Sequence, residues 1–189
     1  MKQRTLYGIM TAGGVIGMVA AFLQTLEKLV LLQNANAILP CNFNSIFNCS
    51  AVLSAWQSSV FGFPNSIMCL VLFTIFATSG LLGLLGSTLS RSARLTVQAI
   101  SLFTLGFALW FLWQSTYVIG ALCIFCLFCF AGLLMVNWAW LRINAAELPF
   151  ISPRGRACLV RAIKNGVDTL AWLLIAAIVA LAMFLQFYL

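Results

Sequence analysis

Five long runs of apolar residues follow one another along the chain, separated by shorter polar segments. Each run is about 20 residues long or more, which is the length an α-helix needs to cross the hydrocarbon core of a bilayer. We therefore predict an all-α integral membrane protein, with a four-helix transmembrane bundle and a fifth transmembrane helix. The predicted helices cover residues 7–26, 63–86, 95–119, 121–141 and 167–189.

Composition supports this class and excludes a soluble fold. Of the 189 residues, 63% are hydrophobic and only 7% are charged. The first run is too long for the apolar part of a signal peptide and has no clear cleavage pattern, so we expect it to be retained as a helix. Within it, Gly13 and Gly17 form a small-residue pattern that lets two membrane helices approach closely.

The positive charges indicate the orientation in the membrane. The net charge is +7 with no histidine, and lysine and arginine gather in alternate connecting segments. Because such an excess marks the cytoplasmic side, we predict a cytoplasmic N-terminus and a periplasmic or otherwise extracytoplasmic C-terminus. The residues that carry this argument are Lys2, Arg4, Arg91, Arg94, Arg142, Arg154, Arg156, Arg161 and Lys164.

This topology divides the chain into segments. Residues 1–141 form the four-helix core, residues 142–166 a basic cytoplasmic loop, and residues 167–189 the fifth helix. The extracytoplasmic loop 32–63 has no charge and carries scattered apolar side chains, so we expect it to cap the helix ends. Within the loop, residues 50–56 favour a short helix lying in the interface.

Four of the seven cysteines map to the outer side, where disulfides persist. Cys41 and Cys49 lie in the capping loop, whose asparagines favour a mobile excursion. Cys123 and Cys126 begin the fourth run, one helical turn apart, so their sulfurs share a helix face and can form a disulfide. A position in the first turn would favour the thiolate of Cys123. These two pairs predict a redox site.

The remaining cysteines are interpreted as bystanders. Cys69 and Cys129 lie within spans and read as packing residues, and Cys158 falls on the reducing side. The run of Cys123, Cys126 and Cys129 also suggests a soft-metal site in a metal-binding or structural subunit. The absence of histidine weighs against that alternative, and a fourth ligand at ferredoxin-like spacing is missing because position 133 is leucine.

Two other polar sites lie near the outer surface. Asn65 begins the second run, where an unpaired amide is costly unless neighbouring backbone or a ligand satisfies it. Glu27 and Lys28 follow the first run at its outer end. We interpret them as an interfacial pair with Lys28 extended toward the head groups, and the alternative is a proton-handling role for Glu27.

A mobile outer pair and an embedded pair suggest a relay by disulfide exchange. The embedded pair would pass its electrons to a quinone, which is lipid-soluble and takes two electrons and two protons. The cysteine order, with Phe61-Gly62 and Asn65-Ser66 in between, resembles the bacterial form of the vitamin K epoxide reductase family over about residues 7–141. In DsbB, the related quinone-linked oxidase, the Cys-x-x-Cys comes before the spaced pair. The opposite order in this chain favours the vitamin K epoxide reductase type.

The resemblance implies a role for each residue. Cys41 would exchange with a DsbA-like thioredoxin-fold protein, and Cys49 would pass electrons to Cys123. Cys126 would face the quinone, and Asn65 would hydrogen-bond a carbonyl of that quinone. It further implies a bacterial inner membrane and ubiquinone or menaquinone as acceptor. Whether the resting disulfide joins Cys41 to Cys49 or Cys49 to Cys123 stays open.

This chain departs from the family in two respects. Members that reduce vitamin K epoxide have a tyrosine four residues after the second cysteine of the Cys-x-x-Cys, where this chain has Phe130 at the quinone site. Many bacterial members carry a fused thioredoxin-like domain that we do not find after residue 189, so we expect a separate partner chain. Reduction of a quinone or of vitamin K epoxide as the physiological task is the alternative function.

Overall fold

The computed structural model describes residues 3–87, 89–149 and 151–189, so Lys2 of the charge argument lies outside the described residues. Five helices in it are long and apolar enough to cross a membrane, and the described residues form no strand beyond one isolated bridge. The predicted class, an all-α membrane bundle, is confirmed. These helices are α1 (Gln3–Gln33), α3 (Asn65–Leu84), α4 (Arg91–Trp113), α5 (Ile124–Asn144) and α7 (Val167–Tyr188).

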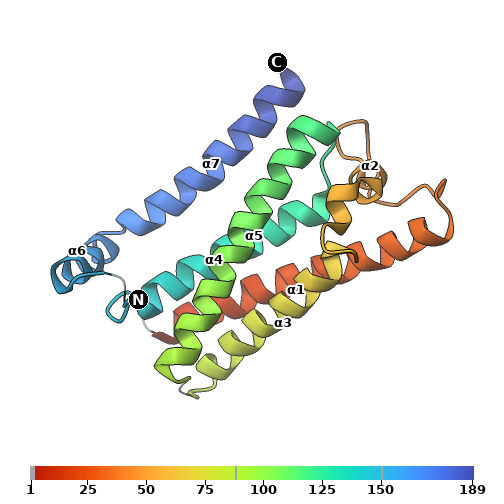
Figure 1. Ribbon diagram of the computed structural model, residues 1–189. Coiled ribbons are helices and arrows are strands. Elements are labelled where there is room, and N and C mark those ends of the chain that lie inside the picture. The colour runs from red at the N-terminus through yellow and green to blue at the C-terminus, as the bar shows by residue number, and fades with distance from the viewer. Residues whose placement is uncertain (1–2, 88, 150) are drawn as a thin grey trace.

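Helix α1 packs closely against both α3 and α5, and Figure 1 shows it running beside α3. Small residues make this approach possible. A Cβ on Gly14 would lie 2.6 Å from the backbone nitrogen of Ala77, and one on Gly17 would lie 2.1 Å from the ring of Phe73. The glycine pattern in the first run was therefore correctly read as a packing face.

Helix α4 packs on α5 and continues into the π-helical segment η2 (Gln114–Ile119). It stops at Gly120, whose φ of 72° ends the helix in a left-handed conformation. The end predicted for the third helix, at residue 119, is therefore confirmed, and the helix begins earlier than predicted, at Arg91. Only Gly120 to Cys123 separates η2 from α5, so the two helices are antiparallel neighbours.

A cap of two short helices lies between α1 and α3. Helix α2 (Cys49–Ser54) is followed by the 3₁₀ segment η1 (Trp56–Ser59). The helix predicted over residues 50–56 thus begins one residue earlier and breaks at Ala55, which is extended. We call the end of the bundle that carries α2, η1, η2 and Cys123 the cap end, and Figure 1 shows α2 there.

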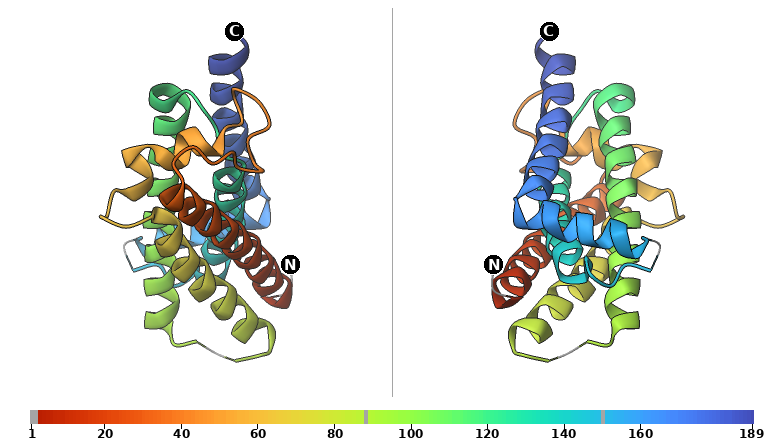
Figure 2. Two further views of the ribbon diagram at one scale, coloured as in Figure 1. Left: turned by 90° about the vertical axis from the view of Figure 1, so that its right-hand side faces the viewer. Right: turned by 90° about the vertical axis from the view of Figure 1, so that its left-hand side faces the viewer.

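The opposite end carries the basic segment predicted as a loop. That segment contains the helix α6 (Pro153–Lys164), which is capped by the Ser152 hydroxyl and was not predicted. Helix α7 then runs along the outside of the bundle (Figure 2). Its first turn is fixed to α5 by an ion pair between Arg142 and Asp168, 2.6 Å apart.

Candidate redox site

Backbone hydrogen bonds dock the capping loop onto the segment that precedes α5. Asn48 N–H donates to the carbonyl of Leu122 at 3.0 Å, and Leu122 N–H donates to the carbonyl of Ile46 at 2.7 Å. These bonds form the one isolated bridge, Phe47 to Leu122, among the described residues. They bring the chain around Cys49 beside the chain around Cys123, although 74 residues separate the two positions in the printed sequence.

The loop's asparagines set its local shape. Asn44 accepts backbone hydrogen bonds from Ile46 at 2.9 Å and Phe47 at 2.7 Å, which closes a tight turn. Asn48 caps α2 by accepting from the backbone N–H of Ala51 at 3.0 Å. The cap places Cys49 at the first position of α2. The expected irregular loop is therefore held in a defined, docked conformation.

All four predicted cysteines come together at the cap end. Cys41 and Cys49 form a disulfide with Cα atoms 5.8 Å apart, whereas Cys123 and Cys126 are free thiols. Of the two pairings left open, the structure thus has Cys41 bonded to Cys49. The four side chains share one apolar cluster, and Cys41 is only 3% exposed. An outside protein could reach Cys41 only after the docked loop lifts.

Cys123 is the N-cap of α5 rather than a residue of its first turn. A hydrogen bond from the Cys126 thiol lowers the pKa of Cys123, and the backbone N–H groups of Phe125 and Cys126 act in the same direction. Burial and the charge of Glu27 oppose this shift without reversing it. Cys123 lies just before the span, and its lowered pKa favours the thiolate form there.

A narrow cavity opens beside Cys126 among α1, α3, α4 and α5. Its walls are mostly aromatic and aliphatic, including Phe73, Phe107 and Phe111. The few polar groups in an otherwise apolar wall are typical of a site for a flat lipophilic ligand. Those that line it are Gln24, Ser58, Asn65, Ser66 and Thr104.

Two of these polar residues were missed in the sequence. The Gln24 amide donates to Cys126 Sγ at 3.3 Å and is 7% exposed. The hydroxyl of Ser66 is buried and has no hydrogen-bond partner among the described residues. A lone amide inside an apolar span is the signal that points to Gln24. The unpaired hydroxyl of Ser66 could not be recognised before its neighbours were known.

The two predicted quinone contacts lie in different surroundings. Asn65 lines the cavity, but its amide donates to the Gln57 carbonyl at 2.7 Å and its oxygen accepts from Val60 N–H at 3.2 Å. Neighbouring backbone groups therefore already occupy both the amide donor and the oxygen acceptor of Asn65. Phe130 is buried in the main core and is not among the residues that line the cavity. Its predicted contact with a quinone stays a prediction.

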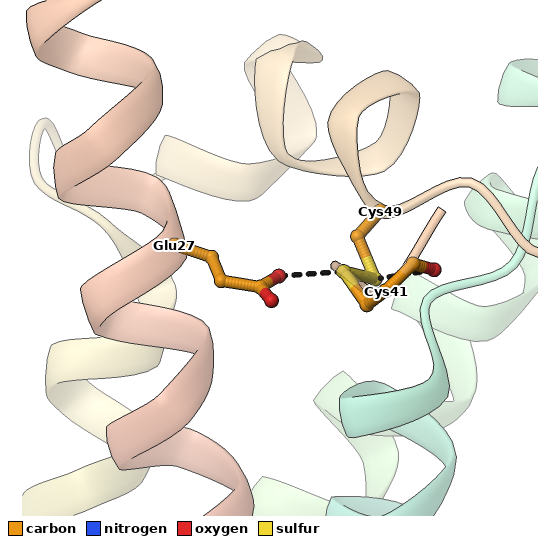
Figure 3. A group of neighbouring side chains, drawn as sticks. All are labelled: Glu27, Cys41 and Cys49. Atoms are coloured by element: carbon orange, nitrogen blue, oxygen red, sulfur yellow. Dashed lines mark hydrogen bonds between the residues drawn. A yellow bond between two sulfur atoms is a disulfide. The ribbon is translucent and has the colours of Figure 1, made fainter. Parts of the chain in front are cut away.

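Glu27 and Lys28 point to different partners, so the interpretation as an interfacial ion pair was wrong. Lys28 is 8% exposed and donates to the carbonyl of Leu53 and, at 3.1 Å, to the hydroxyl of Ser58. It thus binds the last turn of α2 instead of reaching toward head groups. The carboxyl of Glu27 points at the disulfide, with an oxygen 2.5 Å from Cys41 Sγ (Figure 3).

Two of the remaining cysteines lie at the site. Cys69 and Cys129 line the cavity with Cys126, so they have a place at the site beyond core packing. In the described part of the chain, the one cluster with metal-ligand spacing is Glu27, Cys41 and Cys49. Because Cys41 and Cys49 are bonded to each other and the thiolate is the metal ligand, this cluster is poorly suited to a metal in the disulfide form.

Comparison with known proteins agrees with this geometry. The family model described as the vitamin K epoxide reductase family matches residues 8–143, which include all four helices of the core and every residue of the cysteine site. A search of curated proteins found no match.

Proposed function

Because the chain belongs to the vitamin K epoxide reductase family, we propose that it reoxidises a DsbA-like thioredoxin-fold protein and passes the electrons through two cysteine pairs to a membrane quinone. The family makes it a membrane oxidoreductase of disulfide and quinone chemistry. The observation that carries the finer proposal is the gathering of four cysteines in one cluster, with one pair bonded and the other free beside a cavity.

The relay balances as two successive disulfide exchanges. A partner dithiol reduces the bond between Cys41 and Cys49 and leaves as a disulfide. The Cys49 thiolate then attacks Cys123 in a bond to Cys126, and Cys41 attacks Cys49 to release Cys123. The result is a bonded loop pair and a reduced embedded pair, which is the state that the structure records.

We infer that a quinone would approach the Cys126 sulfur through the apolar cavity beside it. A bound quinone would accept two electrons and two protons as Cys123 and Cys126 close to a disulfide. Gln24 holds the Cys126 sulfur at the wall, and the unpaired hydroxyl of Ser66 offers a hydrogen bond to a carbonyl oxygen. The aromatic wall would favour a lipophilic ring over water beside the reacting sulfur.

The proposal includes a location. We infer a bacterial inner membrane with the cap end on the periplasmic side, because the lysine and arginine excess lies at the opposite end. Thiol exchange would then take place where disulfides persist. The DsbA-like partner would be a separate chain that reaches Cys41 when the docked loop lifts.

Restoration of disulfide formation in cells that lack DsbB tests the proposal. We expect the wild-type protein to restore it and Cys126→Ala to abolish it, because the embedded pair then cannot form a disulfide. Cys158→Ala is the matched control, since Cys158 is exposed on α6 far from the site. Failure of the wild type, or full activity of Cys126→Ala, would refute the proposed function.

Loss of Cys41 separates the two exchanges. In Cys41→Ala the partner protein has no sulfur to attack, so its oxidation should stop. Small dithiols that enter the cavity should still reduce the embedded pair, and quinone reduction by them should persist. Equal loss of both activities would place Cys41 in the quinone chemistry and contradict the relay.

A further inference from the structure

Glu27 is the one acid in this chain that faces sulfur instead of a cation. The chain has three acidic residues, and the other two, Glu147 and Asp168, form ion pairs with Arg94 and Arg142. Glu27 has no ion pair among the described residues, and its carboxyl oxygen lies 2.5 Å from Cys41 Sγ. Since a disulfide sulfur carries no proton, this contact becomes a hydrogen bond only when the carboxyl or a reduced Cys41 holds one.

The cation next to Glu27 in the sequence is held by other partners. Lys28 is anchored to α2 by its bonds to the Leu53 carbonyl and the Ser58 hydroxyl. An adjacent ammonium group would stabilise the ionised carboxylate of Glu27 and so oppose its protonation. With Lys28 engaged elsewhere, Glu27 is free to gain and lose a proton beside the sulfur. Glu27 is only half-buried, so its carboxyl can exchange that proton with water.

We propose that Glu27 is the catalytic acid and base of the loop pair, taking the proton from the Cys41 thiol and returning it to the Cys41 thiolate. This proposal rests on the proposed function and assigns the proton in two of its steps. The carboxyl is supplied by the helix α1, while the sulfur is supplied by the docked loop, as Figure 3 shows.

The proton and electron balance follows the relay. When Cys49 is bonded to Cys123, the Cys41 thiol gives its proton to the Glu27 carboxylate. The Cys41 thiolate then attacks Cys49, the bond between Cys49 and Cys123 breaks, and Cys123 leaves as a thiolate. When the partner protein later closes its own disulfide, Cys41 leaves as a thiolate and takes the proton back from Glu27. No oxidant or reductant beyond those of the relay is needed.

The structure matches the state reached after Cys41 has attacked Cys49 and released Cys123. The loop disulfide has formed, and the embedded pair is reduced. At that point Glu27 would hold the proton it took, and a neutral carboxyl is the form that tolerates contact with a sulfur in an apolar cluster. Because the carboxyl also influences Cys123, neutralising it favours the thiolate that has just left.

The test compares Glu27→Gln and Glu27→Asp with the wild type. Quinone reduction by a purified, reduced DsbA-like protein is followed with a short-chain ubiquinone from about pH 6 to about pH 9, which brackets the usual thiol pKa of about 8.5. We expect Glu27→Gln to be about 100-fold slower near pH 6, the scale of general acid–base catalysis. The deficit should shrink as pH rises, because Cys41 then ionises unaided. Glu27→Asp should recover part of the rate.

Recovery at high pH also shows that Glu27→Gln is folded. Glu147→Gln, the same substitution at the opposite end of the bundle, is the matched control and should keep the wild-type profile. A Glu27→Gln variant with the wild-type profile, or with the same deficit at every pH, would overturn the role of Glu27. A wild-type protein that reduces no quinone would instead overturn the proposed function, and this result needs no variant to be recognised.

Discussion

At the scale of single residues, the two sulfurs of the Cys-x-x-Cys differ in their surroundings. Cys123 caps a helix and accepts hydrogen bonds, so its pKa is lowered. Cys126 lies in the first turn of α5 beside the cavity and accepts a hydrogen bond from the amide of Gln24. One sulfur is thus prepared for exchange with the loop pair, and the other is placed for reaction in the membrane.

The lowered pKa of Cys123 predicts a pH dependence. With the embedded pair reduced, we expect Cys123 to ionise below the usual thiol pKa of about 8.5, so the thiolate should be enriched at neutral pH. In Cys126→Ala the hydrogen bond is lost and the transition should move to higher pH. Ultraviolet absorbance of the thiolate, with Cys123→Ser subtracted, measures it. An unmoved transition in Cys126→Ala would contradict the assigned cause.

The amide of Gln24 predicts a second effect at residue scale. In Gln24→Leu, Cys126 loses its hydrogen-bond donor, and we expect kcat/KM for quinone reduction to fall about tenfold, the equivalent of about 1.4 kcal/mol. Gln33→Leu on the same helix is the control, because Gln33 is exposed at the end of α1. Equal effects of the two substitutions would mean that the contact with Cys126 does not matter.

At the scale of elements, α1 positions most of the site. One face of it packs on α3 and α5 through glycines, and its last turns carry Gln24, Glu27 and Lys28 to three different partners. Helix α2 is held at its start by Asn48 and near its end by Lys28. A cation at the C-terminal end of a helix is favourable, which helps fix this short element.

The close contact between α1 and α3 predicts opposite effects of one substitution at two glycines. Gly14→Ala would bring a Cβ to 2.6 Å from the Ala77 backbone, so the helices must separate and stability should fall by about 1–3 kcal/mol. Gly106→Ala, within α4, meets nothing within 4 Å and should be neutral or stabilise by up to about 1 kcal/mol. Thermal unfolding in detergent compares them. A Gly14→Ala variant as stable as Gly106→Ala would contradict the packing.

At the scale of the whole molecule, charge and sulfur lie at opposite ends. Arg94 and Arg142 form ion pairs at one end of the bundle, and the basic helix α6 follows there. The four cysteines gather at the cap end. This separation is the physical basis for the proposed orientation, in which basic residues stay in the cytoplasm.

The orientation predicts which face of the membrane admits a thiol reagent. In intact cells, a membrane-impermeant maleimide should modify a cysteine introduced by Ser45→Cys, because Ser45 is exposed in the capping loop. The native Cys158 on α6 is also exposed, yet it should react only after the membrane is opened. Labelling is read by mass shift on gels. The reverse pattern would place the loop pair in the cytoplasm and remove the proposed partner.

Much of the element scale was predictable from the sequence. All five spans were predicted, with ends displaced by a few residues, because a helix must be apolar over the whole hydrocarbon thickness. The displaced ends have local causes. Extended Ala55 breaks the capping helix, and the hydroxyl of Ser90 caps α4, so that helix begins at Arg91 instead of residue 95. The helix α6 was missed because its sequence is short, basic and polar on average, so it forms no apolar run of the kind that marks the spans.

The sequence by itself determined the class, the spans and the candidate cysteines, because bilayer thickness and thiol chemistry act on residue types and spacings regardless of distant neighbours. Only the tertiary structure decided which side chains meet. Gln24 reaches Cys126, Glu27 reaches Cys41 and Lys28 reaches Leu53 across long stretches of sequence. Such contacts depend on the rotation of each packed helix and on the docking of the loop, and neither is encoded in local patterns.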